Sequence, residues 1–188
     1  MRTRFLFLFS VLFFGFVISS CSSNDEALTT FDGQQFNLMS KGVKGGVCMF
    51  IAPDCPLSQS YVQSFMDLSK QYEDDFQFFG VLPGTLFSNE EVQLFIDSFE
   101  FALPMVQDPN HHLTKKWKAT VTPEFILFDT SSLALYSGAI DNWAISLAKK
   151  RLEPSQFYLE EAINAYLQHK PITTPRTRPV GCYIEGID

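Results

Sequence analysis

Positive charge and cysteine are both scarce in this sequence. Its 188 residues include 14 Lys and Arg against 21 Asp and Glu, a net charge of −7, and only four cysteines. A chain this acidic is a poor candidate for a nucleic-acid partner, because such binding depends on basic side chains that neutralise phosphates. The sequence also lacks internal repeats and any sign of a second domain. We therefore expect one domain with a sizeable core.

The first twenty residues differ from the rest of the chain. Arg2 and Arg4 precede an almost wholly apolar run from Phe5 to Ile18, and two serines then lead into Cys21. A basic start, a short apolar run and small residues are typical of a secretory signal, and the run is short for a membrane span. The residues before Cys21 resemble the lipobox of bacterial lipoproteins, which implies cleavage before Cys21 and lipid on its sulfur. The alternatives are an uncleaved anchor and cleavage elsewhere.

Hydrophobic periodicity predicts alternating strands and helices. A hairpin is expected within residues 31–38, around an Asp-Gly pair, and continuous apolar runs predict buried strands. The expected strands are 47–51, 76–82, 103–106, 124–128 and 133–140, and the expected helices are 56–72, 88–99, 111–118 and 155–167. This order predicts an α/β fold in which a central mixed sheet is flanked by helices on both faces.

Cys55 is the candidate reactive residue. It follows the first central strand and precedes Pro56, which suits the first position of a helix because its missing N–H needs no partner there. The free N–H groups and the dipole of a helix N-terminus favour a thiolate, the reactive form of cysteine. The alternative is a cysteine without a redox role on a binding scaffold.

Three motifs carry a resemblance to a known family. They are Phe50-Ile-Ala-Pro-Asp-Cys-Pro-Leu-Ser58, Val121-Thr-Pro-Glu-Phe-Ile-Leu127 and Tyr136-Ser-Gly-Ala-Ile140. Together with the element order, they resemble the thioredoxin-like redoxins of the alkyl hydroperoxide reductase/thiol-specific antioxidant superfamily. The resemblance implies a thioredoxin-like fold, a cis Pro123 beside the reactive cysteine, and a Thr122 backbone that pairs with a substrate peptide.

The resemblance also divides the chain. Together with the signal-like start, it predicts a lipoprotein signal peptide at 1–20, a polar tether at 21–30, a thioredoxin-like domain at 31–169, and a flexible C-terminal tail at 170–188. Within that domain we expect Asp54 and Glu124 to oppose ionisation of Cys55, because both would place negative charge near its sulfur.

Two positions depart from the family pattern. Ser58 stands where thioredoxins carry the second cysteine of Cys-x-x-Cys, so a local disulfide cannot form. We expect the Ser58 hydroxyl to donate a hydrogen bond to the Cys55 thiolate, the alternative being an ordinary first-turn serine. Ala52 stands where peroxiredoxins carry a threonine, so a hydroxyl partner for bound peroxide is missing.

The partner of Cys55 has to come from elsewhere in the chain. A strand rises about 3.3 Å per residue, so the path from Cys48 to Ala52 alone covers roughly 13 Å, beyond the roughly 7 Å that a disulfide allows. We expect Cys48 to be buried as a small hydrophobe. Cys182 lies in the tail beside Gly181, and we hypothesise that it forms a disulfide with Cys55. The alternatives are a mixed disulfide with a partner and a tail cysteine without a redox role.

Three functions stay open. The first is a thiol-disulfide oxidoreductase, lipid-anchored in the bacterial cell envelope and facing the periplasm or the outside, in which Cys55 attacks, Cys182 resolves and Thr122-Pro123 positions a thiol or disulfide substrate. An external thioredoxin-like reductant would regenerate it. The second is a thiol peroxidase of low efficiency. The third is a non-catalytic or copper-handling adaptor, with copper held by Cys55, Cys182 and a histidine. Only the first two are enzymes, and none of the motifs indicates a cofactor or a resident metal.

Overall fold

The computed structural model describes residues 28–187, and its centre is a five-stranded mixed sheet. Across the sheet, the strands are β5 (Met105–Asp108), β4 (Phe76–Pro83), β3 (Gly45–Phe50), β7 (Glu124–Asp129) and β8 (Ala134–Gly138). β3 is parallel to β4, and β4 to β5, whereas β7 runs antiparallel to both of its neighbours. The sheet therefore matches the predicted strand–helix alternation that ends in a hairpin.

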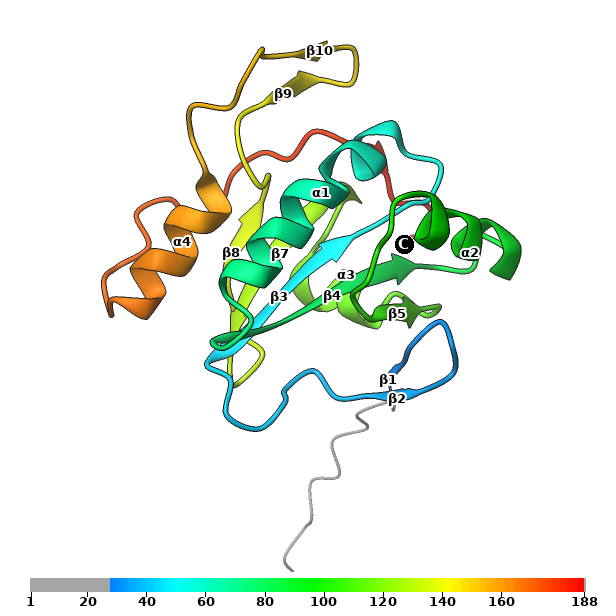
Figure 1. Ribbon diagram of the computed structural model, residues 1–188, viewed down its shortest axis with the longest axis horizontal. Helices are drawn as coiled ribbons and strands as arrows, with labels where there is room; N and C mark the ends of the chain where they lie inside the picture. Colours follow the sequence, from blue (N-terminus) through cyan, green and yellow to red (C-terminus); the bar gives the residue numbers. More distant parts are fainter. Residues whose placement is uncertain (1–27, 188) are drawn as a thin grey trace, which may run out of the picture.

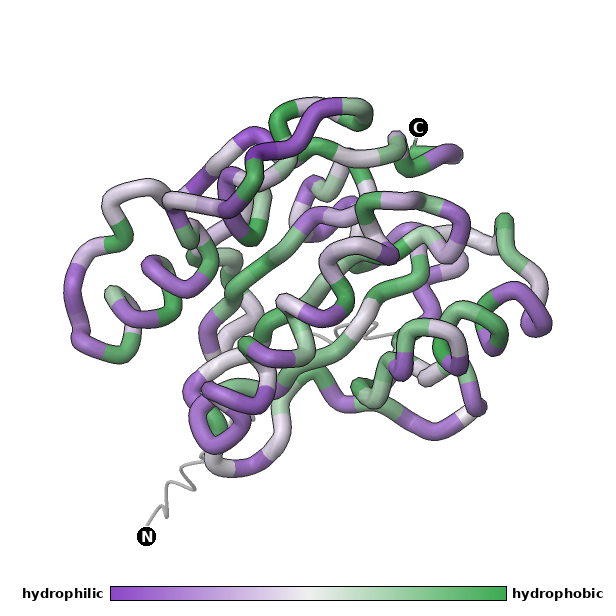
Figure 2. The backbone as a smooth tube through the Cα atoms, turned by 45° about the horizontal axis from the view of Figure 1, so that its top comes forward, coloured by the Kyte–Doolittle hydropathy of each residue, from purple (hydrophilic) through white to green (hydrophobic). Residues whose placement is uncertain are grey.

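Helices cover both faces of the sheet, as predicted. They are α1 (Pro56–Gln71), α2 (Asn89–Ser98), α3 (His112–Trp117) and α4 (Tyr158–Leu167). Successive residues of β3 face opposite ways: Val47 and Met49 pack with α1 and α4, while Cys48 and Phe50 pack with Trp117 of α3. α1 accordingly lies in front of the sheet and α3 behind it in Figure 1. Hydrophobic stretches follow the central strands and alternate with polar ones along the helices (Figure 2).

The folded part begins earlier than the sequence suggested. β1 (Leu28–Thr29) pairs with β2 (Gln35–Phe36) to form the expected Asp-Gly hairpin, and Thr30 bridges to Val106 next to the sheet edge. Residues 28–30, which we had assigned to the tether, thus belong to the domain, because Leu28 packs against the core behind the sheet and Thr30 is buried. The predicted signal peptide and Cys21 lie outside the described residues. No helix within 28–187 is long and apolar enough to cross a membrane.

Four short strands were not predicted. β9 (Ala144–Ser146) and β10 (Lys149–Lys150) form a hairpin that projects from one end of the sheet, and β6 (Val121–Thr122) pairs with β11 (Cys182–Tyr183). The C-terminal segment, red in Figure 1, runs from α4 across the ends of β8 and β7 toward the start of α1. The tail is therefore packed on the domain and is not the flexible extension we expected, because its backbone pairs with strands of the domain.

Candidate active site

Cys55 lies where β3 passes into α1. Its backbone is extended, its N–H bonds the Ala52 carbonyl oxygen at 3.0 Å, and Pro56 occupies the first turn, as predicted. The side chain of Cys55 is only 1 % exposed. The helix start therefore directs backbone N–H groups at a sulfur that is almost completely covered.

The structure brings Cys182 into contact with Cys55. The Cys182 thiol donates to the Cys55 sulfur across 2.7 Å, and both residues are free cysteines. Cys182 reaches this position because β11 lies antiparallel along β6, with Cys182 opposite Thr122. Gly181 makes the approach possible, since a Cβ there would overlap the carbonyl group of Thr122. Two sulfurs separated by 127 positions in sequence thus share one site.

The two thiols differ in acidity. Burial opposes ionisation of Cys55, but hydrogen bonds from the Cys182 thiol and from nearby backbone N–H groups, including that of Ser58, outweigh it and hold the Cys55 pKa below its ordinary value. Burial, the contact with Cys55 and the negative charge of Asp54 raise the pKa of Cys182 to about 12. Cys55 is therefore the more acidic thiol of the pair, and Cys182 is the less acidic one.

Thr122 and Pro123 lie directly beside the sulfurs. The peptide bond between them is cis, as the resemblance implied, and the Thr122 carbonyl oxygen accepts a hydrogen bond from the Cys55 thiol at 3.0 Å. The backbone of Thr122, expected to pair with a substrate peptide, already pairs with the chain's own strand β11. Its role toward a substrate stays a prediction.

Ser58 is fully buried one turn into α1. Its hydroxyl oxygen accepts a hydrogen bond from the Ala52 N–H at 3.4 Å, while its own backbone N–H is among the donors that lower the Cys55 pKa. The described contacts of Ser58 with Cys55 therefore run through its backbone. The predicted role of its hydroxyl toward the thiolate stays a prediction.

The two acidic residues do not act as expected. Neither Asp54 nor Glu124 is among the main influences on the Cys55 pKa; Asp54 raises the pKa of Cys182, and Glu124 raises that of Cys48. The reason is strand alternation: Phe125 faces α1, so its neighbour Glu124 faces the other side of the sheet. There Glu124 accepts the Thr120 N–H at 2.9 Å, and its burial raises its pKa.

The remaining thiol, Cys48, lies in the core. Cys48 is completely buried in β3, as predicted, and burial raises its pKa well above the ordinary value. In the part of the chain that the structure describes, no three His, Cys, Asp or Glu side chains gather closely enough to hold a metal ion.

Sequence reasoning missed the residues that seat the tail. Thr177 accepts the Ala139 N–H at 2.9 Å and shares a hydrogen bond with the Tyr136 hydroxyl at 2.6 Å. Gly138 admits Thr177, because a Cβ at Gly138 would overlap it. The tail residues carry no periodic pattern, and the only local signal was the glycine next to Cys182.

Comparison with known proteins identifies the family of this chain. A family model described as "AhpC/TSA family" matches residues 23–136. The chain belongs to the AhpC/TSA family. A search among curated proteins found no significant match.

Solved structures share the fold at low sequence identity. A hypothetical protein from Sinorhizobium meliloti is 20 % identical with a TM-score of 0.70, covering 84 % of this chain and 88 % of that chain. The exposed lipoprotein thioredoxin of Streptococcus pneumoniae is 16 % identical with a TM-score of 0.55, covering 76 % and 96 %. A thiol-disulfide oxidoreductase from Bacteroides fragilis is 14 % identical with a TM-score of 0.53, covering 76 % and 93 %. The AhpC/TSA chain thus has the thioredoxin-like fold that its motifs predicted.

The acidity of Cys55 should depend on Cys182. In the reduced protein, we expect thiolate absorbance in the far ultraviolet to rise with a midpoint pH below the pKa of an ordinary cysteine. Cys182→Ala removes the strongest hydrogen bond to the Cys55 sulfur, so the midpoint should move to higher pH. Cys48→Ala, which alters a thiol remote from the pair, is the matched control. A midpoint unchanged by Cys182→Ala would contradict the assignment.

Proposed function

We propose that this AhpC/TSA protein is a thiol-disulfide oxidoreductase whose redox pair is Cys55 and Cys182. The observation that carries the proposal is the 2.7 Å contact between their sulfurs, combined with their opposite pKa shifts. A cysteine pair in contact, with one acidic thiol and one proton-holding thiol, suits exchange with an external disulfide. The family supports thiol chemistry, and a B. fragilis protein with this fold is a thiol-disulfide oxidoreductase.

The reaction begins at Cys55. Its thiolate attacks one sulfur of a substrate disulfide, forming a mixed disulfide and releasing the other substrate sulfur as a thiolate. Cys182 then attacks the Cys55 sulfur, releases the second substrate thiolate and leaves a Cys55–Cys182 disulfide. The substrate gains two electrons from the pair, and the protons lost by the two cysteines are available to the released thiolates. Thr122-Pro123 would position the substrate backbone, and Ser58 would support the thiolate.

The high pKa of Cys182 does not prevent the second step. Its pKa is raised partly by its hydrogen bond to Cys55 and by the negative charge on that sulfur. Both causes vanish once the Cys55 sulfur is part of a mixed disulfide, so Cys182 becomes more acidic at the stage when it has to attack. The site therefore activates its two thiols in sequence.

Regeneration requires an external thioredoxin-like dithiol. We infer that its thiolate attacks Cys182, because Cys182 is partly exposed whereas Cys55 is covered. The more acidic Cys55 is also the better leaving group. The dithiol supplies two electrons, is itself oxidised to a disulfide, and returns the pair to the thiol state.

The proposed location is the bacterial envelope, with a lipid anchor on Cys21. The signal-like first twenty residues and the serines before Cys21 support this location. A protein of the same fold, the exposed lipoprotein thioredoxin of S. pneumoniae, also supports it. Metabolic labelling with a clickable fatty acid should tag the wild-type chain and leave Cys21→Ala untagged. Labelling of both chains would contradict the anchor.

The redox pair is tested by counting thiols. In mature protein, whose Cys21 sulfur carries the proposed lipid, the reduced form, denatured and trapped with a maleimide, should be alkylated at Cys48, Cys55 and Cys182. The oxidised form should be alkylated at Cys48 alone. Peptide mapping without reductant should recover a linked pair of peptides containing Cys55 and Cys182. Recovery of Cys182 as a free thiol from fully oxidised protein would contradict the proposed Cys55–Cys182 pair.

The same preparations separate the other functions. Hydrogen peroxide consumption that depends on Cys55 and outpaces disulfide exchange would indicate a thiol peroxidase instead. Stoichiometric copper that is lost in Cys55→Ser, without any disulfide exchange, would indicate a copper-handling adaptor.

A further inference from the structure

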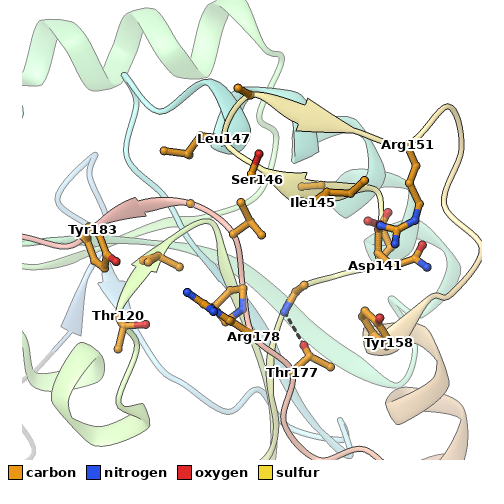
Figure 3. A pocket seen from close by; sticks show the side chains of 18 residues that line it. Thr120, Asp141, Ile145, Ser146, Leu147, Arg151, Tyr158, Thr177, Arg178 and Tyr183 are labelled. Atoms are coloured by element: carbon orange, nitrogen blue, oxygen red, sulfur yellow. Dashed lines mark hydrogen bonds between the residues drawn. The ribbon is translucent and has the colours of Figure 1, made fainter.

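The last residues of the chain form an arm with a fixed root. At the root, the Thr177 N–H bonds the Ser137 carbonyl oxygen at 3.0 Å, and the Thr177 hydroxyl is held by Tyr136 and Ala139. Figure 3 shows one of these hydrogen bonds as a dashed line ending at Thr177. Residues 178–187, which we call the arm, continue from it across the site. The root of the arm is therefore held by contacts that do not depend on those at its far end.

The far end of the arm occupies the edge of β6. Cys182 pairs with Thr122 and Tyr183 with Val121, and the Ile184 N–H bonds the Thr120 carbonyl oxygen at 3.1 Å. Backbone groups that are paired in this ladder cannot pair with a second strand at the same time. An extended segment of another protein cannot reach this edge until the arm leaves.

The arm also covers the nucleophile. Val180 and Cys182 pack against the small cluster of Ala52, Cys55 and Leu57, and the Cys55 side chain is 1 % exposed. A substrate sulfur has to come into contact with the Cys55 sulfur in order to react with it. The same movement of the arm therefore frees both the strand edge and the thiolate.

The structure provides room for that movement. A cleft of about 900 Å³ lies between the arm and the β9–β10 hairpin, lined on one side by Val180, Gly181 and Tyr183 and on the other by Ile145 and Leu147. Figure 3 shows the hairpin facing the arm across this space. A ladder of two residue pairs is short, and short exposed elements open locally at low free-energy cost.

We propose that the arm is an internal stand-in for the partner strand, so that β6 alternately binds the arm and an extended, cysteine-containing segment of a protein substrate. The arm leaves, the segment pairs with Thr122, and its disulfide reacts with Cys55. The arm then returns, and Cys182 replaces the substrate sulfur on Cys55 while β11 replaces the substrate strand on β6. The attack of Cys182 on the mixed disulfide and the release of the reduced substrate from β6 therefore occur together. This step rests on the proposed function.

The arm also specifies which segment fits. Gly181 precedes Cys182 on a stretch where a Cβ would overlap the Thr122 carbonyl group. A partner segment that lies in the same register meets the same obstacle, so the residue before its cysteine should be glycine. This preference is a property of the backbone at Thr122 and does not depend on the redox state of the pair.

The test uses two activated peptides and two chains. One peptide has the sequence of residues 178–184 with its cysteine as a mixed disulfide with thionitrobenzoate, and the other carries valine in place of the glycine. The first chain is Cys182→Ser, which keeps the arm; the second also carries Gly181→Val, which prevents docking. We expect the glycine peptide to react with Cys55 at least about tenfold faster in the second chain. In the first chain the arm occupies β6, so only the fraction of molecules whose arm has left can react. The valine peptide should stay slow in both.

Controls separate the possible failures. A chain ending at Pro179, which lacks Cys182 and the far end of the arm, should behave like the Gly181→Val chain without any steric insertion. Glu185→Ala in the Cys182→Ser chain, at an exposed position beyond β11, should behave like the arm-bearing chain. Equal rates for the glycine peptide with and without a docked arm overturn the arm proposal alone, provided that free activated cysteine reacts with Cys55. If no probe reacts with Cys55 in any chain, the proposed function fails, and the arm proposal fails with it.

Discussion

Cys55→Ser is expected to abolish disulfide exchange, with a loss of about a thousandfold or more, because a serine hydroxyl is not ionised near neutral pH and cannot attack a disulfide. Cys55 is the only thiol of the described chain whose pKa lies below its ordinary value; the pKa values of Cys48 and Cys182 are both raised. Cys55 is therefore the thiol best suited to make the first attack on a substrate disulfide. The measurement is the rate at which purified protein reduces a model disulfide in the presence of a dithiol.

Cys182→Ser should block the second step of disulfide exchange and leave the first step intact. Cys55 keeps its helix N-terminus and its backbone donors, so the first step should proceed and leave the substrate linked to Cys55. Mass spectrometry should show this mixed disulfide accumulating, with at most one turnover. Cys48→Ala is the control: its sulfur is completely buried within β3, so its exchange rate should match the wild type. Multiple turnovers by Cys182→Ser would show that an external thiol, and not Cys182, resolves the reaction.

The strand before Cys55 and the helix after it could be predicted from the hydrophobic periodicity of the sequence. The apolar run before Cys55, the proline after it and the helical spacing of residues 56–72 placed a cysteine at a helix start, where the structure has it. These features depend on neighbours a few residues apart. The same reasoning predicted the order of strands and helices along the chain, because buried strands and amphipathic helices each have a characteristic repeat.

The parts that depend on distant contacts could not be predicted. β6 and β11 have two residues each, too few to show a repeat, and they exist only because they pair with one another across the domain. The contact of Cys182 with Cys55 was a hypothesis drawn from a glycine beside a cysteine. Glu124 was expected to oppose ionisation of Cys55 because it follows Pro123, although its alternation with Phe125 already indicated that the two side chains face opposite ways.

Asp108 accepts hydrogen bonds from the start of α3, the helix that precedes β6. Asp108→Ala is expected to lower the free energy of unfolding by about 3 kcal/mol or more. Its carboxylate, 1 % exposed at the end of β5, accepts the Leu113 N–H at 3.1 Å, the Thr114 N–H at 2.8 Å and the Thr114 hydroxyl at 2.7 Å. The residue before α3, His111, provides no side-chain cap. Asp108 therefore caps α3 from the end of β5, and alanine at this position would leave three buried donors without an acceptor.

The effect should reach the active site, because α3 leads directly into β6. Loss of the cap frees the start of α3, and β6 supplies both the Thr122 carbonyl oxygen at Cys55 and the edge that holds the arm. Asp108→Asn keeps one acceptor oxygen and should cost about half as much as alanine. Asp67→Ala, on the exposed face of α1 with a single contact to Gln63, is the matched control and should change stability by less than about 0.5 kcal/mol. Urea denaturation followed by tryptophan fluorescence measures all three, and equal stabilities for Asp108→Ala and Asp67→Ala would rule out the capping role.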